Sequence, residues 1–272
     1  MMRLPPMAKL GLILAGGLIL LALVGPWVAP GSPTSPGGLP YAAPSTAHPF
    51  GTDALGRDVL TRILHGGRSV ILLATISTAI AILIGTTLGM VAAWRQRRSE
   101  HLILRTMDVF LATPAILVVS VLALGIGRGW PAIMLATTLL LIPDLVRLVR
   151  SATLPLIRED YVESALVRGE RDRAILVHEL LPGLIPTLAA DAGLRLLGAT
   201  SLVASASFLG LGLQPPAADW AVMIQENRAG FLIQPWATIT PTLLIATFCL
   251  SACWIGDGIA QIASGRTVDT AR

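Results

Sequence analysis

The chain has 272 residues, of which 54% are hydrophobic and only 13% are charged, and its mean hydropathy is +0.73. Soluble domains carry roughly a quarter charged residues, so this composition excludes an ordinary soluble domain and indicates an integral membrane protein. The net charge of +4 does not indicate nucleic-acid binding, because the basic residues are spread between apolar segments and form no single patch.

Six apolar segments are long enough to cross a bilayer as α-helices, which takes roughly 20 residues each. In chain order they cover residues 10–29, 70–94, 109–127, 131–149, 186–207 and 237–259. The first follows Arg3 and Lys9, as the apolar core of a signal peptide would, but it is longer than such a core and we interpret it as a spanning helix. The sequence therefore predicts an all-α integral membrane protein with six transmembrane helices.

The connection between the first two predicted spans has two parts. Residues 30–50 are rich in Pro, Gly and Ser, which predicts an irregular segment. Residues 51–69 carry apolar side chains at helical spacing, which predicts a helix lying on the membrane surface. We accordingly divide the chain into an N-terminal unit, residues 1–69, and a core of five spans, residues 70–272.

A second long connection, residues 210–236, precedes the last predicted span. It carries Trp220 and Trp236. Because tryptophan is enriched at membrane–water interfaces, we expect both side chains to lie there.

The basic residues are unevenly divided between the two ends of the predicted spans. Counting the ends alternately, fourteen Lys and Arg fall on the side that holds both chain termini and five on the other. The five are Arg57, Arg62, Arg68, Arg128 and Arg228. Since short cytoplasmic loops carry the excess of Lys and Arg, the sequence predicts that both termini are cytoplasmic.

Two pairs of residues at helical spacing lie within the spans. Gly85 and Gly89 form a GxxxG pattern, which permits close helix packing but is also common in membrane helices without a specific contact. Asp191 and Arg195 are four residues apart, so they share a helix face and can form an ion pair. Such a pair is either a self-neutralising structural element or part of a solute path.

The stretch ESALVRGERDRAILVHELLPGLIP, residues 163–186, is the most charged long segment and contains the adjacent His178 and Glu179. A zinc peptidase helix needs a second His four residues after the first, but Pro182 stands there. The chain also has no GxSxG motif and no GxxxxGK[ST] phosphate-binding loop, since its only lysine is Lys9. We predict no catalytic, cofactor or metal site in this chain.

Residues 158–183 predict a helix–turn–helix on the cytoplasmic side between the fourth and fifth spans. Asp160 is expected to cap the first helix, with Glu163 at its third position. Gly169 suits the left-handed backbone that ends a helix, and a second short helix is expected to stop before Pro182. The loop is either a connector resting on lipid headgroups or a binding element, and its length favours binding, because long ordered loops usually bind a partner.

This loop resembles the cytoplasmic signature of binding-protein-dependent ABC importer permeases, which reads Glu-Ala-Ala, three residues, Gly, nine residues, Ile, one residue, Leu-Pro. The residues that match it in register are Glu163, Ala165, Gly169, Leu181 and Pro182. Ser164 replaces the middle alanine and Glu179 the isoleucine. The stretches HPFGTDALGRDVLTRILHGGRS (48–69), SFLGLGLQPPAADWAVMI (207–224) and GDG (256–258) resemble the dipeptide, oligopeptide and nickel subfamily.

The resemblance implies a type I ABC importer transmembrane domain in the bacterial inner membrane. It implies that the chain is embedded in the lipid bilayer and assembles with a second homologous permease, two cytoplasmic ATPase subunits and an extracytoplasmic solute-binding protein. The loop 158–183 would be the coupling helix, and its ATPase-coupling residues would be Glu163, Ser164, Ala165, Gly169, Leu181 and Pro182. ATP and Mg²⁺ would be bound by the ATPase subunits.

Two classes of function are therefore considered, a permease subunit driven by ATPases and a stand-alone channel or ion-coupled carrier. A carrier usually shows an internal repeat and charged residues at mid-membrane, and it has no use for a coupling signature. For the permease, di- and oligopeptides are the expected solutes. Nickel or a metal–chelator complex is the alternative, although a bare metal ion favours His, Cys or clustered carboxylates along its path.

Overall fold

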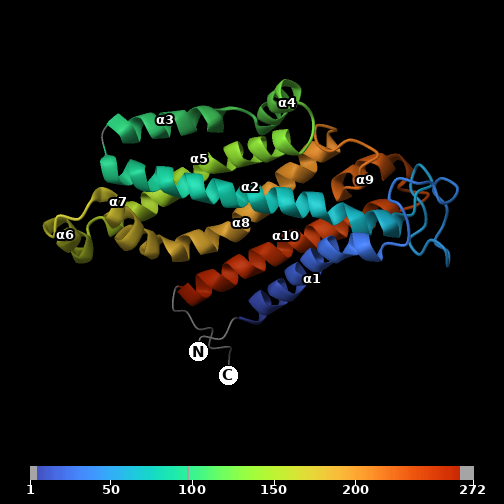
Figure 1. The fold of residues 1–272 in the computed structure, drawn as a ribbon, viewed down its shortest axis with the longest axis horizontal. Helices are drawn as coiled ribbons and strands as arrows, with labels where there is room; N and C mark the ends of the chain where they lie inside the picture. The colour runs from blue at the N-terminus through green and yellow to red at the C-terminus, as the bar shows by residue number, and fades with distance from the viewer. Residues whose placement is uncertain (1–4, 97, 264–272) are drawn as a thin grey trace.

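The computed structural model describes residues 5–96 and 98–263, whose regular secondary structure is helical apart from isolated β-bridges (Figure 1). Four basic residues that contributed to the charge count, Arg3, Arg97, Arg266 and Arg272, lie outside the described residues. Within these described residues, five helices are long and apolar enough to cross a membrane. They are α1 (Pro6–Val28), α2 (Val59–Arg95), α5 (Trp130–Leu156), α8 (Leu181–Phe208) and α10 (Trp236–Ala263).

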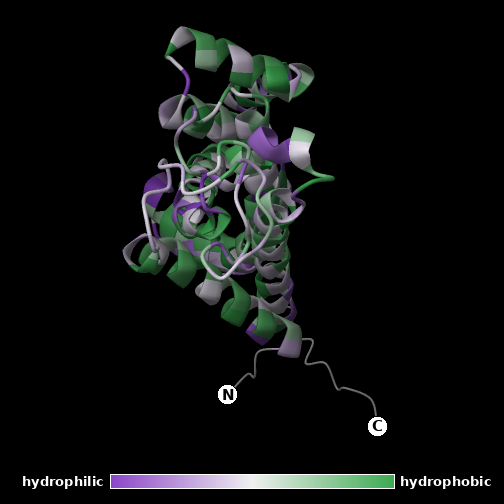
Figure 2. Ribbon diagram, turned by 90° about the vertical axis from the view of Figure 1, so that its right-hand side faces the viewer, coloured by the Kyte–Doolittle hydropathy of each residue, from purple (hydrophilic) through white to green (hydrophobic). Residues whose placement is uncertain are grey.

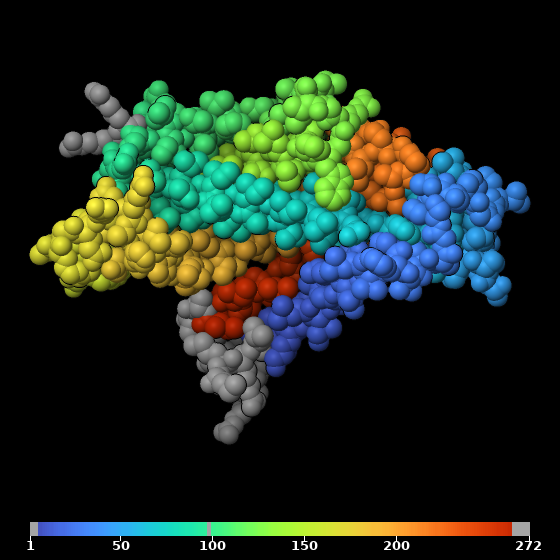
Figure 3. Space-filling model, viewed as in Figure 1, coloured from blue at the N-terminus to red at the C-terminus, as the bar shows by residue number. Residues whose placement is uncertain are grey.

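The long helices extend along the longest dimension of the molecule, and their connections collect at two ends (Figure 1). One end carries α6 (Asp160–Val167) and α7 (Asp172–Ala174), and α6 protrudes there in Figure 3. The other end carries α9 (Trp220–Asn227) and the connection between α1 and α2, in which residues 30–50 are irregular as predicted. Figure 2 faces this second end and shows apolar residues along most of the long helices.

α2 and α5 pack closely because two glycines of α2 remove side chains where the helices meet. A Cβ atom placed on Gly85 would lie 2.8 Å from Leu145 Cδ2, and one on Gly89 would lie 2.7 Å from Val149 Cβ. Close backbone approach at small residues is a main source of helix association in membranes, where lipid is as apolar as the side chains. The GxxxG pattern is therefore a specific contact between these two helices.

The third span differs from the predicted segment at 109–127. α3 (Arg98–Ala112) and α4 (Ala115–Gly125) meet at an angle of 90°. The bend occurs at Thr113 and Pro114, because proline lacks the N–H that continues a helix and also moves the preceding residue away from helical angles. Counted as one bent span, the pair brings the number of spans to six, as predicted, but the predicted boundaries of the third span are wrong.

The prediction of a separate helix on the membrane surface at residues 51–69 is also wrong. α2 runs without a break from Val59 to Arg95, so the expected boundary between residues 69 and 70 falls inside one helix. Gly66 and Gly67 do not interrupt it, because Trp220 packs directly against them. Cβ atoms placed on the two glycines would lie 2.9 Å and 2.5 Å from the indole ring.

The orientation of the chain can be measured with two serines from opposite sides of the predicted topology. Ser35 lies in the connection between α1 and α2, and Ser99 lies in the first turn of α3. After Cys249 and Cys253, the free cysteines, are replaced by serine, a membrane-impermeant maleimide should label Ser35→Cys but not Ser99→Cys in intact cells. Inside-out vesicles should reverse the result, and labelling of Ser99→Cys in intact cells would contradict the topology.

Candidate functional site

The chain between α5 and α8 forms two short helices joined by a tight turn, and we call residues 158–183 the helical loop. α6 ends at Val167, its C-cap is Arg168, and the next residue, Gly169, has a φ of +74°. The Gly169 N–H donates to the Leu166 carbonyl at 3.0 Å, and the Glu170 N–H donates to the Ala165 carbonyl at 3.2 Å. This is a Schellman motif, in which glycine adopts the left-handed conformation without a Cβ clash. The predicted turn at Gly169 is confirmed.

An apolar cluster fixes the helical loop to the long helices. Val162 and Ala165 of α6 are buried against Ile175 and Leu180, the first and last residues of the π-helix η1 (Ile175–Leu180). The partly buried side chains that pack against these four residues are Trp94, Leu156, Ile157 and Leu176. Because α2 ends near Trp94 and α5 near Leu156, a displacement of α6 acts directly on two spanning helices.

The six predicted coupling residues divide into an exposed group and an anchoring group. The exposed group is Glu163, Ser164, Gly169 and Pro182. The anchoring group is Ala165, which is fully buried, and Leu181, which packs partly buried against the cluster of Met90, Leu145, Val149 and Leu184. Val167 adds an apolar side chain to the outward face of α6 and is 83% exposed. This face therefore offers carboxylate, hydroxyl and apolar contacts to a partner.

The first turn of α6 is acidic, but its cap differs from the predicted one. The N-cap is Glu159 and not Asp160, and no side chain makes a capping hydrogen bond. Asp160 and Glu163 nevertheless lie in the first turn, where negative charge is favoured by the helix dipole. Burial raises the pKa of the neighbouring Tyr161, and Glu159 and Glu179 raise it further, so its phenol stays protonated and able to donate a hydrogen bond.

The prediction that the second helix of the loop stops before Pro182 is wrong, because the helix continues through this residue. α7, η1 and α8 follow one another directly, and the Leu181 N–H bonds to the Leu176 carbonyl, five residues back. In a regular α-helix the proline ring clashes with the carbonyl four residues earlier, here that of His178, and the wider π turn relieves this clash. The His178 side chain is exposed, and the described residues contain no group of three potential metal ligands.

A second cluster of charged side chains is buried at the opposite end of the molecule. It consists of Asp53, Arg57, Arg62 and Glu226, which we call the charge network. Asp53 Oδ2 accepts from Arg57 Nε at 2.7 Å and from Arg62 Nη1 at 2.6 Å. Glu226 Oε2 accepts from Arg57 Nη2 at 2.7 Å and from Arg62 Nη1 at 2.6 Å. Two cations are thus matched by two carboxylates, as burial of charge requires.

Further contacts join α9 to the beginning of α2. The Asp219 carboxylate caps α9 by accepting two backbone N–H groups at 2.9 and 3.1 Å, and it also accepts the Ser69 hydroxyl. Burial raises the pKa of Asp219, whereas these hydrogen bonds lower it. Trp220 is fully buried and donates Nε1–H to the Ile63 carbonyl at 2.9 Å, so its predicted position at the membrane interface is wrong.

The predicted ion pair on α8 is present. Arg195 Nε donates to Asp191 Oδ2 at 2.6 Å, and the guanidinium also donates to the Leu141 carbonyl at 3.3 Å. Asp191 lines an open cavity of about 540 Å³ together with Asp257 of α10. The two charges of the pair therefore neutralise each other, and the pair also borders this open cavity. Its role in a solute path stays a prediction.

Residues 85–262 match the family described as "Binding-protein-dependent transport system inner membrane component". This match begins at the GxxxG pattern of α2, ends in α10 and includes the whole helical loop. The chain belongs to this family. It is a permease subunit of an ABC importer. Of the two classes of function considered, the family therefore supports the permease subunit and not the stand-alone channel or carrier.

Named relatives resemble the permease over most of its length. A glutathione transport system permease protein of Pectobacterium atrosepticum is 37% identical over 216 residues, which cover 79% of this chain and 72% of the relative. A dipeptide transport system permease protein of Alkalihalophilus pseudofirmus is 32% identical, with 93% and 84% covered. A putative peptide transport system permease protein of Brucella suis is 30% identical, with 95% and 87% covered.

A solved structure supports the fold. A chain of the MetNI methionine ABC transporter in an inward-facing conformation matches with a TM-score of 0.58 and 17% sequence identity. The match covers 72% of the permease and 93% of that chain. The predicted type I importer transmembrane fold is confirmed.

The charge network was not predicted from the sequence. The count of basic residues places Arg57 and Arg62 on the side opposite the chain termini, but it predicts no carboxylate partner for either guanidinium. The spacing of Asp53 and Arg57 was a usable signal, because they are four residues apart within the stretch that resembles the subfamily. Glu226 gave no such signal, since it is 169 residues from Arg57 along the chain.

Loss of one charge from the network should destabilise the permease strongly. Asp53→Asn leaves Arg57 and Arg62 with a single carboxylate, and breaking a buried ion pair costs about 3–5 kcal/mol. Asp108→Asn is the matched control, because Asp108 and Arg147 form an ion pair with side chains 56% and 51% exposed. Such exposed pairs contribute about 1 kcal/mol or less. Thermal unfolding of the detergent-solubilised permease measures both, and equal losses would contradict the structural role of the network.

Proposed function

We propose that this permease forms one half of the membrane domain of a peptide importer, and that the helical loop is the element on which an ATPase subunit docks. The observation that carries the proposal is the helical loop itself. Its helix α6 protrudes, carries residues that resemble the family's cytoplasmic signature, and is anchored by buried apolar side chains to the ends of α2 and α5. The peptide assignment is supported by the relatives, which are named for transport of glutathione, dipeptides and peptides.

The proposed complex contains a second homologous permease, two cytoplasmic ATPase subunits and an extracytoplasmic solute-binding protein. It lies in the bacterial inner membrane with both termini of this chain in the cytoplasm. ATP and Mg²⁺ bind to the ATPase subunits, so this chain contributes no catalytic residue and no cofactor. Its contribution is part of a solute path that opens when the ATPase subunits change conformation.

The helical loop is suited to convert ATPase closure into movement of the spans. Glu163, Ser164 and Val167 contact the ATPase, and Gly169 sets the angle at which α6 meets it. A displacement of α6 passes through Val162 into the apolar cluster at the ends of α2 and α5. Because packed interiors resist compression, the displacement moves these helices as rigid bodies.

Substitution at the turn should separate docking from insertion. Gly169→Val forces a β-branched residue into the left-handed region, at a cost of roughly 1–2 kcal/mol. No atom outside the turn lies within 4 Å of a Cβ at this position, so the cost is conformational and misdirects α6 alone. We expect normal membrane levels but reduced ATPase co-purification and reduced solute-stimulated ATP hydrolysis.

Two control variants accompany this test. Gly169→Asn should retain most function, because asparagine tolerates the left-handed conformation. His178→Ala should also be tolerated, since the exposed imidazole has no chemical role in docking. Normal assembly of Gly169→Val together with complete loss of function in His178→Ala would contradict the proposed docking role.

The solute can be identified by transport. The complex assembled with its partner subunits in proteoliposomes should accumulate a labelled dipeptide such as alanyl-leucine only when ATP is present. A nickel salt or nickel chelate should neither be accumulated nor compete. Accumulation of nickel without accumulation of any peptide would contradict the peptide assignment and support the metal alternative.

A further inference from the structure

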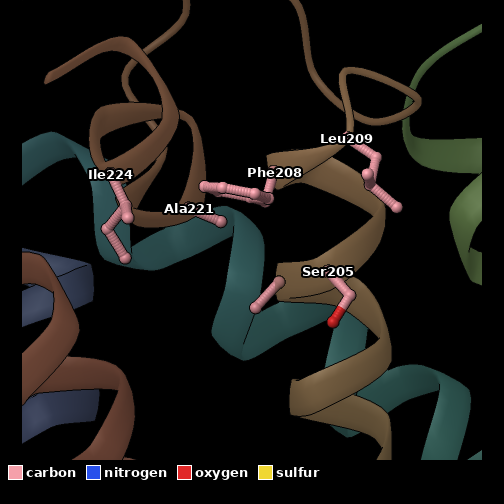
Figure 4. A pocket seen from close by; sticks show the side chains of 6 residues that line it. Ser205, Phe208, Leu209, Ala221 and Ile224 are labelled. Atoms are coloured by element: carbon pink, nitrogen blue, oxygen red, sulfur yellow. The ribbon is translucent and has the colours of Figure 1, made fainter. Parts of the chain in front are cut away.

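A shallow apolar pocket lies between the last turn of α8 and α9, at the end of the molecule that holds the charge network (Figure 4). The residues that line it are Ala204, Ser205, Phe208, Leu209, Ala221 and Ile224. Its volume is about 380 Å³. Small-molecule sites usually fall between about 300 and 1,000 Å³ and combine an apolar lining with a few polar groups. In this pocket the polar side-chain atom is the Ser205 hydroxyl.

Arg228 places a positive charge beside the pocket. It directly follows α9, its side chain is exposed, and its guanidinium carbon lies 5.8 Å from the centroid of the Phe208 ring. Among the residues that the structure describes, Arg228 forms no ion pair, in contrast to Arg57 and Arg62 in the charge network. A free guanidinium presents planar donors that match a carboxylate in a bidentate arrangement.

The surrounding charges leave this guanidinium free for an anion. Glu226, two residues before Arg228, is already bonded to two arginines and so does not compete for Arg228. An anion with an apolar group can therefore place that group in the pocket and its charge on Arg228.

We propose that the pocket and Arg228 form an entry subsite for the C-terminal residue of the imported peptide. The apolar side chain of that residue occupies the pocket, and its carboxylate binds Arg228. This inference rests on the proposed function as a peptide importer. The second permease subunit is the competing occupant, but an apolar helix over this surface would leave the guanidinium buried without a partner, which is costly.

Occupancy of the pocket can be measured by protection of a cysteine. Ser205→Cys is introduced after Cys249 and Cys253 have been replaced by serine, and the assembled importer in nanodiscs is treated with a water-soluble thiol reagent. Alanyl-leucine should slow the modification in a saturable manner. Alanyl-leucine amide, which has the same side chains but no carboxylate, should not.

Substitutions at two exposed arginines test the carboxylate contact. Arg228→Gln should weaken protection by alanyl-leucine about tenfold or more, as expected for loss of a charge-assisted hydrogen bond. Arg128→Gln is the matched control and should leave protection unchanged, because Arg128 is also exposed and lies in the separate connection between α4 and α5. Equal protection by the amide, or full protection in Arg228→Gln, would overturn the proposed subsite.

Two further outcomes separate this inference from the proposed function. If the importer accumulates alanyl-leucine but Ser205→Cys is never protected, the subsite is overturned while peptide import stands. If protection depends on Arg228 but no peptide is accumulated, the subsite is supported and peptide import fails. Modification of Ser205→Cys in the isolated chain but not in the peptide-free complex would show that the partner permease covers the pocket, which overturns the subsite.

Discussion

Charged groups are costly to hold away from water, and this cost decides where the ionisable side chains of the permease lie. At one end, two guanidiniums and two carboxylates pair with one another in the charge network, and the buried Asp219 accepts hydrogen bonds from the Ser69 hydroxyl and from two backbone N–H groups. At the other end Glu163 and Arg168 of the helical loop are exposed. Between the ends, Asp191 is compensated by Arg195 on its own helix.

α2 connects the two ends mechanically. Its 37 residues correspond to about 55 Å of helix, from the charge network at its first turn to Trp94 beneath α6. Trp220 and Asp219 fasten α9 to the first part of this helix, and the glycines at 85 and 89 hold α5 against its second part. The proposed docking surface packs against one end of α2, and the proposed entry subsite adjoins α9, which is fastened to the other end, so α2 links the two proposed sites.

Proline and glycine show where sequence-based prediction fails in this chain. Pro114 ends a helix, whereas Pro143, Pro155 and Pro186 lie inside α5 and α8. Pro182 continues a helix because the π turn before it accommodates the ring. Likewise Gly169 forms a turn, whereas Gly66 and Gly67 lie within α2 beneath an indole ring. The same residue types carry both outcomes, and at Gly66 and Gly67 the side chain that packs against the uninterrupted helix, Trp220, comes from far along the chain.

The sequence by itself determined the membrane class, the number of spans, the turn at Gly169 and the coupling signature, because hydropathy, helical spacing and a local motif depend on neighbouring residues. Only the tertiary structure decided the bend between α3 and α4, the length of α2 and the burial of Trp220. It also decided the partners of Arg57 and Arg62, and it left Arg228 exposed beside an apolar pocket. The partners of Arg57 and Arg62 and the burial of Trp220 depend on contacts between residues more than 150 positions apart, and hydrophobic periodicity carries no information about which distant side chains meet.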